Sequence, residues 1–165
     1  IRKVLARAGP ARVFVHDRLD VALATGCHGV HLGASTLPVA EIRRMAPSLL
    51  IGYSAHGCDE ALRAERDGAS FVTFSPIYET QSKGAGSAQP PQGIEKLAAV
   101  CGALRIPVYA LGGITRLNAA EALRAGAAGV AVVSAITEAE DVESASRRLV
   151  ECVEKTRAEK EERRP

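Results

Sequence analysis

The chain has 165 residues, of which 47% are hydrophobic, so it is long enough for one domain with a sizeable core. Lysine and arginine outnumber aspartate and glutamate by only 21 to 19, and aromatic residues make up 4%. Neither a basic stripe nor a stacking platform for nucleic acid is expected from these values, and small molecules are the expected ligands. No apolar run reaches the ~18 residues of a membrane span, and the first residues lack a signal-peptide core, so no membrane segment is expected.

The four cysteines, Cys27, Cys58, Cys101 and Cys152, lie far apart in the sequence and form no C-x-x-C pair. This spacing disfavours a zinc site and a disulfide framework. A reducing, cytoplasmic compartment fits it best.

Taken in order, the chain alternates short β-branched runs with helical segments. A helix end at residues 1–8 precedes a strand at 13–16, and further strands are predicted at 49–53 and 108–111. Three segments share one plan, a helix-ending glycine followed by a strand that stops at Gly or Ser; they are 25–33, 67–75 and 125–134. Helices are predicted between the strands at 20–25, 38–45, 59–67, 93–103 and 116–125.

Strict alternation of strand and helix requires a parallel sheet, and the regular repeat favours a TIM (β/α)8 barrel over a doubly wound sheet. Six strands are expected here, whereas such a barrel has eight. Because Val142, Ala145, Leu149 and Val153 keep helical spacing after the last strand, the first two strand-helix units are the ones expected to be lacking. Two open sheet edges then predict that residues 1–165 by themselves are either marginally stable or self-associated as a homo-oligomer.

The barrel domain is expected to span residues 1–156. Residues 157–165 are charged and have no apolar face, so they are expected to fray as a solvated tail.

Residues 106–134 carry the clearest signal for ligand binding. One strand ends in Gly112 and Gly113, Thr115 is a good N-cap for the following helix, and the next strand ends at Ser134. Backbone N–H groups can approach a phosphate where no Cβ intervenes, so these strand ends predict an anion cup. A side chain at Gly113 is expected to block the cup while leaving the fold intact.

The connection between Phe74 and Gly93 is too long for a simple turn and shows no apolar period. Thr80, Ser82 and Lys83 offer hydroxyl and ammonium donors for a diphosphate, and the glycines at 84 and 86 would let the loop close as a lid. The alternative is a solvated polar loop without a role in binding.

Six motifs occur in the order and spacing of one family. They are DR at 17–18, GVHLG at 29–33, GYSAH at 52–56, SPIYETQSK at 75–83, ALGGIT at 110–115 and VVSAI at 132–136. On these motifs the chain resembles the thiamine phosphate synthase family, which also includes thiazole tautomerases on the same barrel.

The resemblance implies a transferase that joins two phosphorylated substrates. A hydroxymethylpyrimidine diphosphate loses its diphosphate, and the nitrogen of a thiazole phosphate captures the resulting cation to give thiamine phosphate. It implies a Mg²⁺ ion as cofactor and no protein nucleophile. Carried over by position, Asp17 matches a magnesium ligand, and Ser54 and Lys83 match diphosphate contacts; the thiazole phosphate site matches Thr80, Gln81, Ser82, Gly112, Gly113, Val133 and Ser134.

The chain departs from the family pattern at three places. Thr36 stands where a second magnesium aspartate is expected, and His16 stands where an asparagine precedes Asp17. The early strand with a Gln-x-Arg-x-Lys motif has no counterpart.

Two other functions stay open on the sequence. In a tautomerase a histidine just beyond the third strand moves a proton, and His56 is the candidate here, although it could equally be a helix-start residue. His28 and His31 are expected to be packed and hydrogen-bonded rather than ligands, and Asp20 to be a helix-start carboxylate. A non-catalytic phosphate-binding member of the family is the remaining alternative.

Overall fold

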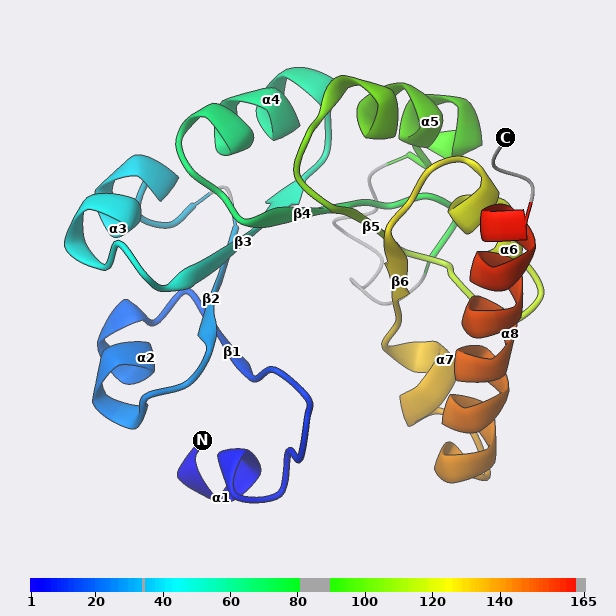
Figure 1. Cartoon of the computed structure of the whole chain (residues 1–165), viewed down its shortest axis with the longest axis horizontal. Helices are drawn as coiled ribbons and strands as arrows, with labels where there is room; N and C mark the ends of the chain where they lie inside the picture. The colour runs from blue at the N-terminus through cyan, green and yellow to red at the C-terminus, as the bar shows by residue number, and fades with distance from the viewer. Residues whose placement is uncertain (34, 81–89, 163–165) are drawn as a thin grey trace.

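The computed structural model of the chain describes residues 1–33, 35–80 and 90–162. Within them six parallel strands form one sheet in sequence order, and Figure 1 shows the sheet curled into an open arc with helices along its outer side. The strands are β1 (Phe14–His16), β2 (Gly29–Leu32), β3 (Leu50–Ala55), β4 (Phe71–Phe74), β5 (Val108–Leu111) and β6 (Gly129–Ala131). The helices are α1 (Arg2–Leu5), α2 (Leu19–Thr25), α3 (Val39–Met45), α4 (Cys58–Arg66), α5 (Gly93–Ala103), α6 (Ala119–Arg124), α7 (Ser134–Thr137) and α8 (Val142–Glu162).

The predicted fold class is confirmed. Every predicted strand appears, neighbouring strands pair in parallel, and the sheet is part of a (β/α) barrel. Among the described residues, β1 pairs only with β2 and β6 only with β5, so the arc accounts for six of the eight strands in a closed barrel.

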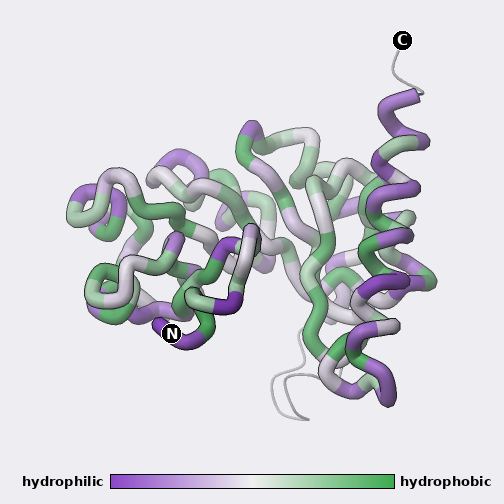
Figure 2. The backbone as a smooth tube through the Cα atoms, turned by 60° about the horizontal axis from the view of Figure 1, so that its bottom comes forward, coloured by the Kyte–Doolittle hydropathy of each residue, from purple (hydrophilic) through white to green (hydrophobic). Residues whose placement is uncertain are grey.

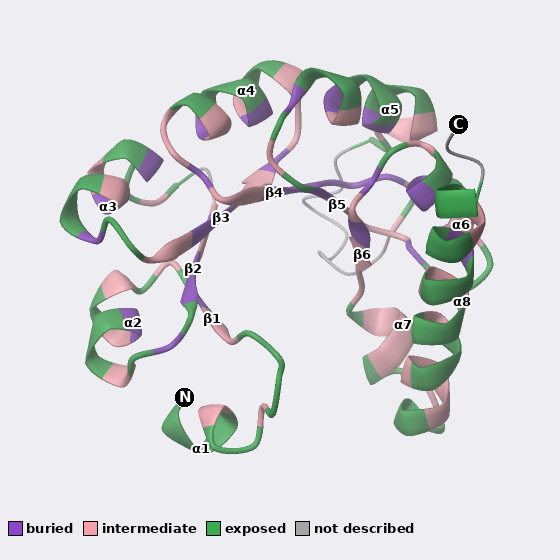
Figure 3. Cartoon of the chain, viewed as in Figure 1, coloured by how far each residue is buried: buried purple, intermediate pink, exposed green. Residues whose placement is uncertain are grey.

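The hydrophobic core lies between the convex side of the sheet and the helices. Val30, Ile51, Val72 and Ala110 point to this side and are fully buried. Alternate strand residues point to opposite faces, so their neighbours in sequence face the concave side. Figure 3 shows the buried residues concentrated in the strands and on the inner faces of the helices.

Aromatic side chains from three strands meet on the concave side. The rings of Phe14 and Phe71 lie edge to face with centroids 5.3 Å apart, and those of Phe71 and Tyr109 lie 5.5 Å apart. Glycines in the neighbouring strands make room for them: a Cβ at Gly52 on β3 would lie 2.4 Å from the Phe71 ring, and one at Gly129 on β6 would lie 2.9 Å from Tyr109. A large side chain on one strand is therefore accommodated by a glycine on its neighbour.

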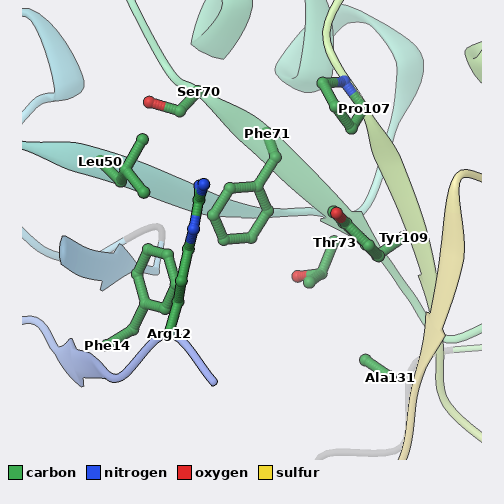
Figure 4. Close-up of a pocket in the computed structure, with 9 residues that line it drawn as sticks. All are labelled: Arg12, Phe14, Leu50, Ser70, Phe71, Thr73, Pro107, Tyr109 and Ala131. Carbon is green, nitrogen blue, oxygen red and sulfur yellow. The ribbon is translucent and has the colours of Figure 1, made fainter. Parts of the chain in front are cut away.

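The same aromatic rings line a hollow of about 390 Å³ on the concave side, shown in Figure 4. Arg12, Leu50, Ser70 and Pro107 also line it, and they lie at or just before the N-terminal ends of their strands. The hollow thus opens toward the end of the barrel opposite the one that carries active sites in this fold class.

The structure differs from the sequence-based expectation at the last helices. Helix α6 begins at Ala119 rather than 116, because the Asn118 side-chain oxygen accepts a hydrogen bond from the Thr115 N–H in a preceding turn. The short helix α7 after β6 was not predicted.

The expected fraying is wrong for residues 157–162, and residues 163–165 lie outside the described ranges. Helix α8 continues to Glu162, and its last turns are hydrophilic in Figure 2. Arg157 donates a hydrogen bond to the Ala128 carbonyl, and Lys160 donates one to the Leu123 carbonyl at 3.3 Å. Charged side chains therefore hold this end of the helix against the loop between α6 and β6, without an apolar face.

None of the helices in the described ranges combines the length and apolarity that a membrane crossing requires. All four cysteines are free thiols, and Cys27 is buried.

Arg43 on α3 joins three segments that meet at the N-terminal edge of the sheet. Its guanidinium donates to the carbonyls of Pro47 at 2.7 Å, Leu49 at 2.8 Å and Gly68 at 2.8 Å, and to the Ser70 hydroxyl at 3.2 Å. The planar fork can reach several acceptors at once, which an ammonium group does less well.

We expect Arg43→Ala to lower the free energy of unfolding by about 2–3 kcal/mol, because it leaves several carbonyl groups without a donor. Arg44→Ala is the matched control on the same helix, since Arg44 is exposed and its partner is Glu41 on the surface. Urea unfolding of both variants measures the difference. Equal stability of the two would show that the Arg43 contacts contribute nothing.

Candidate active site

All six strands run in the same direction, so their carboxyl ends meet along one edge. In barrels of this class that edge carries the active site. The sequence-based candidates in the described residues follow five of these strand ends, after β1, β3, β4, β5 and β6.

Asp17 follows β1 with a left-handed backbone, φ 58°. Its N–H donates to the His31 carbonyl at 3.0 Å, and its Oδ1 accepts a hydrogen bond from the Gly33 N–H at 3.1 Å. The Thr36 hydroxyl donates to the Gly33 carbonyl at 2.8 Å. Asp17 and Thr36, the two positions considered for magnesium from the sequence, are thus both tied to Gly33.

Within the described residues, no group of three or more His, Cys, Asp or Glu side chains could hold a metal ion. The Asp17 carboxylate by itself nevertheless suits Mg²⁺, because that ion commonly binds through one or two carboxylates together with substrate phosphates. The donor set suits a metal that arrives with a phosphorylated ligand.

Ser54, near the end of β3, belongs to a polar cluster on the concave face. Its Oγ lies 2.9 Å from His31 Nε2, and Thr73 Oγ1 lies 3.3 Å from the same nitrogen and 3.4 Å from Ser54 Oγ. Burial lowers the pKa of His31, and the charge of His16 lowers it further, whereas Asp17 opposes the shift. The imidazole is therefore held neutral beside the two hydroxyls.

His56 follows β3 and contacts Glu60 and Ser75. The backbone N–H of His56 donates to the Glu60 carboxylate at 2.7 Å, a contact that supports a role for His56 at the start of α4. The ring Nδ1 of His56 lies 2.7 Å from the Ser75 carbonyl oxygen. A carbonyl can only accept, so Nδ1 carries the proton, and in the neutral ring Nε2 has the lone pair. The geometry therefore supports both interpretations of His56, as a helix-start residue and as a base.

The predicted cup falls at the ends of β5 and β6. Among the described residues, the backbone N–H groups of Gly113, Val133 and Ser134 have no acceptor. Gly112 and Gly113 adopt positive φ angles of 91° and 65°, and the Asn118 amide donates to the Gly113 carbonyl at 2.9 Å. Unpaired amides beside glycines are the groups that a phosphate binds.

The segment after β4 lies directly on this cup. The N–H of Ile77 donates to the Leu111 carbonyl at 2.9 Å, and the N–H of Tyr78 donates to the Gly112 carbonyl at 3.1 Å. The Tyr78 hydroxyl donates to Glu121 at 2.6 Å, and burial together with this carboxylate raises the pKa of the phenol. Thr80 therefore continues from a segment that is anchored beside Gly113.

Gln81, Ser82 and Lys83 lie outside the described residues, as do the glycines at 84 and 86 of the expected lid. Their assigned roles in binding stay predictions.

The expectation that His28 and His31 are hydrogen-bonded is confirmed, since His28 Nδ1 accepts from the Val13 N–H at 2.9 Å. What sequence reasoning missed is that His31 and Thr73 surround Ser54. The alternation of side chains along each strand could have placed His31 and Thr73 on the concave face. Only the pairing of β3 with β4, however, puts Thr73 opposite Ser54.

Asp20 is a helix-start residue as expected, and its ion pair with Arg18 lowers its pKa to about 2.

The fold and this edge define a (β/α)-barrel protein with hydroxyl groups and unpaired backbone N–H groups at the carboxyl ends of its strands. The family model for thiamine monophosphate synthase matches residues 1–136. The chain belongs to the thiamine monophosphate synthase family.

Individual relatives agree with the family model. The chain is 47% identical over 153 residues to a thiamine-phosphate synthase of Chlorobium luteolum, covering 92% of this chain and 71% of the relative. It is 46% identical over 149 residues to a thiamine-phosphate synthase of Chloroflexus aurantiacus, covering 90% of this chain and 68% of the relative. Among solved structures, a thiamine phosphate pyrophosphorylase from Pyrococcus furiosus superposes with a TM-score of 0.83 at 39% identity, over 94% of this chain and 73% of that one.

The structure corrects one expectation about Gly113. A Cβ at this position would lie 2.5 Å from the Glu79 carbonyl oxygen and 2.7 Å from the Tyr78 Cβ. A side chain there would displace the segment after β4, so the substitution would lower stability rather than leave the fold unaffected.

We expect Gly113→Ala to lower the free energy of unfolding by about 1–3 kcal/mol, through the positive φ and this contact. It should also weaken phosphate binding by roughly tenfold, the equivalent of one lost hydrogen bond. Gly102→Ala is the control, because a Cβ there meets nothing within 4 Å. Urea unfolding and calorimetry with thiazole phosphate measure the two effects. Unchanged binding by Gly113→Ala would remove this residue from the cup.

Proposed function

We propose that this chain catalyses the coupling of hydroxymethylpyrimidine diphosphate with thiazole phosphate, the reaction that gives its relatives the name thiamine-phosphate synthase. The observation that carries the proposal is the presence of two separate sets of anion-facing groups on one edge of the sheet. One set is the polar cluster of His31, Ser54 and Thr73, and the other is the amide cup at Gly113 and Ser134. Two sets suit two phosphorylated substrates held side by side.

The first set would bind the diphosphate that leaves. The Ser54 hydroxyl can donate to a diphosphate oxygen while Thr73 donates to His31 Nε2 in its place. A neutral His31 keeps both hydroxyls oriented without adding a second charge. The protein's contribution is to position the leaving group and the incoming nitrogen, since the resemblance implies no covalent intermediate.

The second set would hold the thiazole phosphate. The backbone N–H groups of Gly113, Val133 and Ser134 would donate to the phosphate oxygens, and the anchored segment at Ile77 and Tyr78 would bring Thr80 toward the same group. The ring nitrogen of this substrate could then be held facing the pyrimidine.

Asp17 would hold a Mg²⁺ ion. When bound, that ion would neutralise the charge that develops on the leaving diphosphate. With Thr36 in place of a second carboxylate, the chain by itself should bind the ion weakly, and diphosphate oxygens should strengthen the binding.

Ser54→Ala should lower kcat/KM for thiamine phosphate formation on the order of 10²-fold, because it removes a donor to the charge of the leaving group. The control is Ser35→Ala, an exposed serine in the loop between β2 and α3. A coupled assay that measures diphosphate release checks both variants. Full activity of Ser54→Ala, with the same unfolding transition as the parent, would contradict the role of this hydroxyl.

Thiazole tautomerisation is a second candidate, favoured by one observation. The hydrogen bond from His56 Nδ1 to the Ser75 carbonyl leaves Nε2 with the lone pair that a proton-transfer base requires.

His56→Gln distinguishes the two activities. If the chain is a tautomerase, the variant should lose proton exchange at the thiazole carboxylate phosphate by about 10²-fold or more, because glutamine cannot accept the proton. If it is a synthase, diphosphate release should fall by less than about tenfold. Proton exchange followed by NMR and the diphosphate assay measure the two rates. A chain that binds thiazole phosphate without either activity would be a non-catalytic member of the family.

A further inference from the structure

Tyr78, in the segment after β4, is fixed beside the cup by both its main chain and its side chain. Its backbone N–H donates to the Gly112 carbonyl at 3.1 Å, and its hydroxyl donates to Glu121 Oε2 at 2.6 Å. Glu121 lies in the first turn of α6, the helix that follows β5. The Tyr78 side chain therefore connects the segment after β4 to the helix after β5.

Gly113 contacts both segments that this hydrogen bond joins. Its carbonyl accepts from the Asn118 amide at 2.9 Å, and Asn118 directly precedes α6. A Cβ at Gly113 would lie 2.7 Å from the Tyr78 Cβ, so the tyrosine lies against the glycine backbone. The position of the Gly113 N–H, a predicted donor to phosphate, thus depends on the segment after β4 and on the start of α6.

The bond between the phenol and the carboxylate is charge-assisted. A hydroxyl that donates to a carboxylate forms a shorter and stronger bond than two neutral groups do, and 2.6 Å lies in the range of such bonds. Burial raises the pKa of the Tyr78 phenol, and the hydrogen bond to Glu121 raises it further, so the hydroxyl stays a donor well above neutral pH. The connection is therefore maintained wherever the Glu121 carboxylate is ionised.

We propose that Tyr78 and Glu121 are positioning residues for the thiazole phosphate, because their hydrogen bond holds the Gly113 N–H and the segment after β4 in the arrangement that receives the phosphate. The inference rests on the proposed function, in which Gly113 belongs to the cup for this substrate. Neither side chain is part of the polar cluster at Ser54, which would bind the diphosphate. Loss of the bond should therefore weaken the binding of one substrate and leave that of the other unchanged.

A second pair of tyrosine and glutamate provides the matched control. The Tyr53 hydroxyl donates to Glu60 Oε1 at 2.9 Å and links β3 to α4 by the same chemistry. In the sheet, β4 separates this strand from β5 and the cup. Tyr53→Phe thus removes a bond of the same kind without touching the segments around Gly113.

The first measurement is calorimetry with thiazole phosphate alone, on variants whose folding is checked by urea unfolding. Tyr78→Phe and Glu121→Ala should each weaken binding about fivefold, the equivalent of one hydrogen bond, whereas Tyr53→Phe should change it by less than about twofold. Glu121→Gln should bind within about twofold of the parent, because its amide oxygen still accepts from the phenol. The double variant Tyr78→Phe with Glu121→Ala should bind no more weakly than either single variant.

Steady-state kinetics gives the second readout. Tyr78→Phe should raise KM for thiazole phosphate about fivefold and leave both kcat and KM for the pyrimidine diphosphate within about twofold of the parent, because the bond acts on the binding of one substrate.

Three results would overturn the inference alone, in a parent that forms thiamine phosphate. They are unchanged thiazole phosphate affinity in Tyr78→Phe, an equal loss in Tyr53→Phe, and losses that add in the double variant. A parent that binds thiazole phosphate without forming thiamine phosphate would contradict the proposed function, and the affinities would then decide the inference by themselves. A parent that does not bind thiazole phosphate would overturn both.

Discussion

The parallel pairing of β2, β3 and β4 is the constraint on which the candidate site depends. Ser54 and Thr73 are register partners, and His31 is paired with Gly52 two residues before Ser54. A shift of one residue in either pairing would turn these side chains to the helix-covered face, because alternate residues in a strand point in opposite directions. The buried residues on the convex side, such as Val30 and Ile51, hold the register that aligns the polar cluster.

The concave face depends on residues without side chains. A Cβ at Gly52 would lie 2.4 Å from both His31 Nδ1 and the Phe71 ring, so any other residue there would displace the histidine that contacts Ser54. In the same way, Gly112 admits Pro76, whose Cα would lie 2.7 Å from a Cβ at that position. These glycines therefore allow the close approach of side chain and backbone on both sides of β4.

The segment after β4 links the two sets of anion-facing groups. It follows Ser75, whose carbonyl accepts from His56, and it continues along β5 through the N–H groups of Ile77 and Tyr78. The Tyr78 hydroxyl then reaches Glu121 on α6. A change at the cup is therefore expected to reach His56 through this segment, since both contact the same short stretch of chain.

The sequence by itself determined the alternation of strands and helices, the barrel class and the position of Gly113 and Ser134 at strand ends, because these depend on local periods and on glycines at strand ends. Only the tertiary structure decided that Thr73 and His31 surround Ser54, that Asp17 is held by Gly33, and that α8 keeps its helix through Arg157. These contacts join residues far apart in the chain, and their geometry depends on strand register and on loop conformation. Neither is encoded in the local pattern of any one segment.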